Sequence, residues 1–181
     1  MSQENMNEKK SKMERFIDYC ADGLENIEGT IRKAAAYLPT KLLYRACAKQ
    51  SPSMADVALK LGADANSKDK VWWGKVERHH HGFGCTDRKT ICITPFVFAA
   101  VVACEQKKQD NAQTQKLMDT LQKNTNLDSV ARVQSTWRMA GSFRFLKGNT
   151  YDCSLKEVVK DRTVALLPEV VCAFLRTRQH D

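Results

Sequence analysis

Histidine and cysteine side chains, both common zinc ligands, gather in one short stretch of this chain. They are His79, His80, His81, Cys85, Asp87 and Cys92. Their spacing matches no common zinc finger, and three adjacent histidines cannot easily face one ion. We therefore predict that the chain has no metal site and needs no metal to fold.

The same stretch contains the strongest candidate for nucleophilic catalysis. Cys85 stands four positions after His81, which would place a thiol near a base if the backbone between them were held in a fixed turn. The chain also lacks the nucleophile-elbow, phosphate-loop, zinc-protease and dinucleotide-binding motifs. We predict a protein that is not an enzyme and binds no cofactor.

Two adjacent tryptophans, Trp72 and Trp73, precede the histidines and lie among Lys70, Lys75 and Arg78. Indole rings beside cations could stack on nucleic-acid bases. They could also cover an apolar helix surface, or anchor a protein partner, because tryptophan is over-represented in the residues that dominate such interfaces. All three interpretations remain open from the residues alone.

The composition indicates a soluble chain in a reducing compartment. The chain has 181 residues, seven scattered cysteines without a C-x-x-C pair and a formal net charge of +8. It contains no apolar run of about 18 residues and does not begin like a secretion signal. We expect a cytoplasmic protein without a membrane partner, and the positive charge leaves nucleic acid as an alternative partner.

Helical periodicity extends over most of the chain after a polar tail at residues 1–11. Two apolar stripes predict helices over residues 12–39, and Pro39 is expected to end the second. A further helix is predicted over residues 42–49. Ser51 and Pro52 then begin another helix, and Gly62 ends it.

The segment KLLYRACAKQSPSMADVALKLGADAN resembles one ankyrin repeat, because Gly62-Ala63-Asp64-Ala65-Asn66 is similar to the G-A-D-V-N of that family. Thr94-Pro95-Phe96-Val97-Phe98-Ala99 is similar to its T-P-L-H-x-A opening. The resemblance implies stacked antiparallel helix pairs joined by fingers. Leu43 and Phe96 lie about 20 residues further apart than the ankyrin period of about 33 allows, so residues 70–93 are interpreted as an enlarged finger loop.

A divergent second repeat follows, with Asp110 and Gln113 as a capping box and Leu117, Met118 and Leu121 as its buried stripe. Residues 129–140 are predicted to be a helix and 141–153 to be irregular. Closing helices are predicted over 154–161 and 168–178. The full division is a tail (1–11), N-terminal capping helices (12–39), a repeat (40–69), an inserted loop (70–93), a divergent repeat (94–127) and C-terminal helices (128–181).

These observations predict an all-α, ankyrin-like single domain that binds another protein, either as a regulatory adaptor or as an effector delivered by a pathogen into host cytoplasm. The predicted partner-binding residues are Trp72, Trp73, Arg78, His79, His80, His81, Phe83, Tyr44 and Arg45. The C-terminal sequence LPEVVCAFL is loosely similar to a SOCS-box tail or an F-box start, which would imply a ubiquitin-ligase adaptor. That adaptor and nucleic-acid binding through basic residues are the two alternatives.

Overall fold

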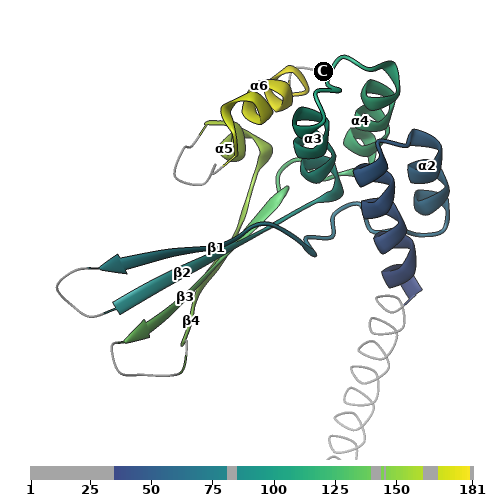
Figure 1. Cartoon of the computed structure of the whole chain (residues 1–181). Coiled ribbons are helices and arrows are strands. Elements are labelled where there is room, and N and C mark those ends of the chain that lie inside the picture. The colour runs from purple at the N-terminus through teal and green to yellow at the C-terminus, as the bar shows by residue number, and fades with distance from the viewer. Residues whose placement is uncertain (1–34, 81–84, 140–143, 145, 161–166, 180–181) are drawn as a thin grey trace, which may run out of the picture.

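Helix pairs and β-hairpins alternate along the chain (Figure 1). The computed structural model describes residues 35–80, 85–139, 144, 146–160 and 167–179. The first pair is a helix over residues 35–49 followed by α2 (Pro52–Lys60). The elements after it are β1 (Lys70–His80), β2 (Cys85–Ile93), α3 (Pro95–Glu105), α4 (Ala112–Asn124), β3 (Ala131–Met139), β4 (Leu146–Cys153), α5 (Leu155–Lys160) and α6 (Glu169–Thr177).

The four strands form one antiparallel sheet in the order β1-β2-β3-β4. The all-α prediction is therefore wrong, and the protein has a mixed α/β fold. The sheet extends away from the helices as a narrow twisted blade, with the ends of β1 and β3 at its far end (Figure 1). Pairing between β2 and β3 is continuous from Cys85↔Met139 to Ile93↔Ala131, so the blade is a single sheet rather than two separate hairpins.

The first hairpin occupies the segment that was predicted to be an inserted loop. Between Val71↔Cys92 and Lys75↔Thr90 the register shifts, so β1 carries more residues than β2 over this interval. Such a bulge bends its strand and interrupts the ladder locally. The aromatic pair Trp72-Trp73 falls within this interruption, which obscured the strand pattern in the sequence.

The second hairpin corrects two further predictions. Residues 129–140 were expected to form a helix because Val130, Val133 and Trp137 recur at helical spacing, but Ala131–Met139 is β3. The segment expected to be irregular contains β4. In β3 the alternation of Ala131 and Val133, both buried, with the exposed Arg132 follows the period of a strand.

In the first helix pair, the end of α2 was predicted correctly, whereas the predicted end of the preceding helix at Pro39 was wrong. The helix over residues 35–49 continues through Pro39, contrary to the prediction, because proline removes one hydrogen bond but leaves the following residues free to remain helical. At the end of α2, Gly62 adopts a φ of +87°. The Gly62 and Ala63 amides donate to the carbonyls of Leu59 and Ala58, which is the Schellman arrangement of a helix end.

The middle pair carries the centre of the core. Every residue of α3 from Pro95 to Cys104 is buried, and α4 buries Leu117, Met118 and Leu121 as predicted. Thr94 precedes α3 but makes no side-chain capping bond, and the cap of α4 is Asn111 rather than Asp110. The Asn111 side chain accepts from the Gln113 amide at 2.8 Å.

The last pair confirms the two predicted C-terminal helices and closes the stack. Helix α6 packs on α3 as well as on α5, with Val171, Cys172 and Leu175 buried. Arg178, just after α6, pairs with Asp119 of α4, and its carbonyl accepts from the Gln122 side chain at 2.8 Å. One apolar core therefore joins all three helix pairs to the near end of the sheet.

Candidate interaction surface

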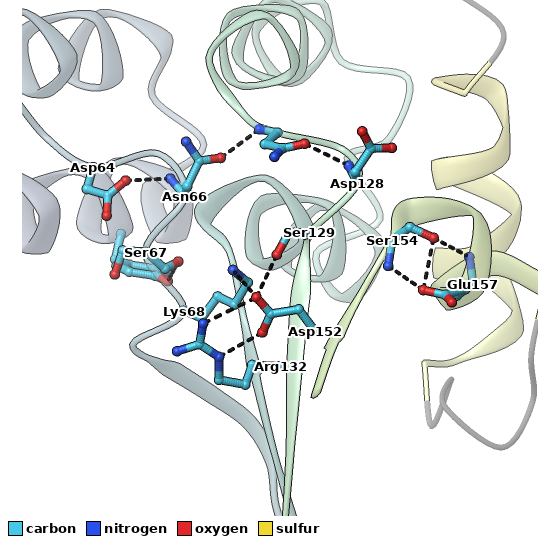
Figure 2. Close-up of polar contacts among 12 residues, drawn as sticks. Asp64, Asn66, Ser67, Lys68, Asp128, Ser129, Arg132, Asp152, Ser154 and Glu157 are labelled. Atoms are coloured by element: carbon cyan, nitrogen blue, oxygen red, sulfur yellow. Dashed lines mark hydrogen bonds and ion pairs between the residues drawn. The ribbon is translucent and has the colours of Figure 1, made fainter. Parts of the chain in front are cut away.

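A charged cluster joins the sheet to the link after α2 (Figure 2). The Asp152 carboxylate of β4 accepts from the Arg132 Nε of β3 at 2.7 Å and from the Ser129 hydroxyl at 2.8 Å. The Lys68 Nζ lies 3.3 Å from the same carboxylate. These contacts lower the pKa of Asp152, chiefly through the hydrogen bond from Arg132, so the carboxylate stays ionised.

A ladder of hydrogen bonds connects the loop after α2 with the loop after α4 (Figure 2). The Asn66 amide donates to Asp64 Oδ1 at 2.9 Å, and the Asn66 side chain accepts from the Asn126 amide at 2.6 Å. The Asn126 side chain in turn accepts from the Asp128 amide at 2.9 Å. Both loops thus contain an Asx turn at the corresponding place, the start of the segment that leads into a hairpin.

Tyr44 lies at the base of the first hairpin and is half-buried rather than fully exposed, and its role in binding a partner stays a prediction. Its hydroxyl lies 2.8 Å from the Ser67 carbonyl and 2.7 Å from the Ile93 carbonyl and donates to one of them at a time. Burial is the main cause that raises the pKa of Tyr44. Tyr44 therefore fastens the entry and exit of the β1-β2 hairpin to the first helix.

Exposed apolar side chains lie on one face of β3 and β4. Side chains of a strand alternate between the two faces, so Trp137 and Met139 share the face of the buried Ala131 and Val133. The register places Leu146 opposite Trp137, and Tyr151 opposite Val133. This apolar row, defined as Trp137, Met139, Leu146 and Tyr151, is between 38% and 55% exposed.

The residues predicted to bind a partner are spread over three parts of the molecule. Trp72, Trp73, Arg78, His79 and His80 have their backbone in β1, and their side chains lie outside the described part of the structure. His81 and Phe83 also lie outside it. Arg45 is exposed on the helix over residues 35–49. The segment predicted to be a finger loop is instead a strand of the blade, and its role in binding stays a prediction.

The sequence analysis missed the apolar row because it assigned β3 to a helix and left β4 without structure. The signal was present in ARVQSTWRM, where apolar residues fall at every second position except Ser135. No comparable signal marks LKGNTYDC, in which only Leu146, Tyr151 and Cys153 are apolar. The β4 contribution follows only from its pairing with β3.

Among residues whose side chains the structure describes, no group of three His, Cys, Asp or Glu lies close enough to hold a metal ion. The free thiol of Cys47 is buried, and burial raises its pKa. Within the described ranges, no helix is long and apolar enough to cross a membrane.

Comparisons of the chain with protein-family profiles, with curated protein sequences and with solved structures gave no match. The interpretation of the surface therefore depends on its own geometry.

Proposed function

We propose that this chain is a non-enzymatic protein-interaction module built from ankyrin-like units whose fingers are extended into a β-sheet. The repeated order of helix pair and hairpin supports the repeat interpretation. The ladder from Asp64 to Asp128 supports it further, because it links corresponding loops of successive units. The packing of α6, rather than α5, on α3 is a departure from a regular repeat.

The apolar row on the blade is the observation that carries the proposal. Contact with water is unfavourable for apolar side chains such as Trp137 and Leu146, and the four residues of the row lie together on one face of β3 and β4. Aromatic residues and methionine are enriched where proteins contact one another. A partner that covers this face would remove the unfavourable exposure.

The alternatives receive less support. The apolar residues of α6 that resemble a ubiquitin-ligase recruitment motif are in the core, since Val171 and Leu175 are 1% and 0% exposed. They are therefore not available to a second protein without local opening. The Asp152 carboxylate is ionised between two cations, which makes it a poor proton acceptor and does not favour an enzyme.

The proposal is tested by capture followed by measurement with purified components. The full chain is immobilised, bound proteins are identified by mass spectrometry, and the dissociation constant of each purified candidate is then measured. The double variant Trp137→Ser/Leu146→Ser should weaken the complex by about tenfold or more. Val57→Ser, which removes an exposed apolar side chain from α2, is the matched control and should leave affinity unchanged.

A second double variant tests the predicted finger residues separately. Trp72→Ala/Trp73→Ala should cost the complex about 2 kcal/mol or more if these residues are anchors. A loss of thermal stability instead would indicate that they pack within the protein. Normal binding by both double variants would contradict the proposal.

A further inference from the structure

A pocket of about 400 Å³ opens where the helix over residues 35–49 meets the base of β1. Its floor is aromatic, with the rings of Tyr44 and Phe98 at 5.7 Å between centroids and an interplanar angle of 66°. Phe98 is 7% exposed and Tyr44 is half-buried, so the floor is held rigidly by the core and by the Tyr44 hydroxyl contacts. This corner pocket has the shape and lining to take an apolar side chain.

Cations surround the mouth of the corner pocket. Lys41, Arg45 and Lys70 all line it and are exposed, whereas Asp69 is its one acidic lining residue. Within the described part of the chain none of these three cations forms an ion pair. Lys70 Nζ lies 5.3 Å from the Phe98 ring centroid and Lys41 Nζ lies 4.3 Å from that of Tyr37. Each ammonium group therefore lies over an aromatic ring and keeps its full positive charge at the mouth of the pocket.

The corner pocket lies on the same side of the sheet as the apolar row. Lys70 pairs with Ile93, which pairs with Ala131, and Ala131 shares its face of β3 with Trp137. A partner that covers the apolar row from this side therefore meets positive charge at the base of the blade. The net charge of +8 also attracts a negatively charged partner at longer range.

We propose that the corner pocket and the apolar row together bind an acidic protein segment, with an apolar side chain of that segment in the pocket and its carboxylates on Lys41, Arg45 and Lys70. This inference rests on the proposed function and specifies its partner. Charge complementarity determines which segments bind and raises the rate of association. The aromatic floor provides a buried site for an anchoring apolar side chain of the partner.

The test uses a library of random dodecapeptides displayed on phage and selected against the full chain. The selected pool should be enriched in Asp and Glu together with an aromatic or aliphatic residue. The best peptide is then made with a fluorescein label, and its dissociation constant is measured by anisotropy. Arg45→Gln/Lys70→Gln should weaken its binding by about tenfold or more. Binding should also weaken as NaCl rises from about 0.05 M to about 0.5 M.

The matched control is Lys108→Gln/Lys116→Gln, which removes the same charge from exposed positions outside the pocket and should leave affinity nearly unchanged. Equal losses for both double variants would overturn the inference, because only net charge would then matter. Peptides without acidic enrichment that still depend on Trp137 and Leu146 would overturn it and leave the proposed function standing. Failure to select any peptide would count against both this inference and the proposed function.

Nucleic acid is tested in the same assay with a fluorescein-labelled single-stranded oligonucleotide. Tighter binding of the oligonucleotide than of the best peptide, lost in Arg45→Gln/Lys70→Gln, would overturn the inference in favour of a nucleic-acid surface. Weaker oligonucleotide binding, lowered equally by both double variants, would support the acidic segment as the specific partner.

Discussion

Gly62 ends α2 in a backbone conformation that few residues adopt. Its φ is +87°, and an added Cβ would meet no atom within 4 Å. The cost of another side chain at this position is therefore conformational rather than steric. Residues with a branched Cβ are the least tolerant of positive φ, whereas asparagine adopts it comparatively often.

We expect Gly62→Val to lower the free energy of unfolding by more than about 1 kcal/mol, measured by urea denaturation. Gly62→Asn should lower it less, because its short polar side chain is tolerated in the left-handed region. Equal stabilities for the two variants would contradict the assigned role of the glycine.

Asp152 makes a pH-dependent contribution to stability. Its pKa in the folded state lies below the ordinary value of about 3.9, so its contribution is complete above that value and is lost as the pH falls through the folded pKa. Its side chain is 36% exposed, and solvent screening reduces the contribution accordingly.

Asp152→Asn should lower the free energy of unfolding by about 1 kcal/mol at pH 7, and the difference from the unmodified protein should shrink below about pH 4. Urea denaturation at both pH values measures this. Asp128→Asn, at an exposed carboxylate without an ion pair among the described residues, should have little effect at either pH. A difference for Asp152→Asn that persists unchanged to low pH would contradict the role of the charge.

At the scale of one element, α5 depends on its first turn. The helix has six residues, too few for a stable isolated helix. The Glu157 carboxylate accepts from the Ser154 amide at 2.6 Å, and the Glu157 amide donates to the Ser154 hydroxyl oxygen at 3.2 Å (Figure 2). These reciprocal bonds form a capping box, at the point where β4 ends and the last helix pair begins.

Ser154→Ala should therefore lower the free energy of unfolding by about 1 kcal/mol. Ser154→Asp should restore most of the loss, because aspartate is also a good N-cap, although its charge lies close to Glu157. Chemical denaturation of the three proteins measures both effects. No loss in the alanine variant would show that packing alone maintains α5.

For the molecule as a whole, the core indicates that helices and sheet unfold together. Ile91, Ile93 and Val133 belong to the same buried cluster as the helical residues. The chain has three tryptophans, Trp72, Trp73 and Trp137, and all three lie in strands. Tryptophan fluorescence therefore reports on the sheet, whereas circular dichroism at helical wavelengths reports on the helices.

We expect the two signals to give the same midpoint in urea, as a single cooperative transition requires. The continuous β2-β3 pairing connects the far end of the blade to the core and supports this expectation. A fluorescence midpoint at clearly lower urea would contradict it and would identify the blade as a separate unit.

Local signals in the sequence were sufficient for most helices. Pro52 and Gly62 bound α2, and the stripes Leu117, Met118 and Leu121 in α4 and Val171 and Leu175 in α6 are buried as predicted. These elements are determined by residues within a few positions of one another, since helix hydrogen bonds and caps are short in sequence. Pro39 is the exception, where the neighbouring turns maintained the helix.

The sheet was decided by contacts that are remote in the sequence. Cys92 pairs with Arg132 across the whole α3-α4 pair, and the residues of β4 acquire their two faces only by pairing with β3. By itself the sequence determined most of the helices and the glycine that ends α2. Only the tertiary structure decided that residues 70–93 and 131–153 contribute two hairpins to one sheet, and that Trp137 and Leu146 share a face. The physical reason is that a strand satisfies its backbone hydrogen bonds with another strand, whose identity a local pattern does not contain.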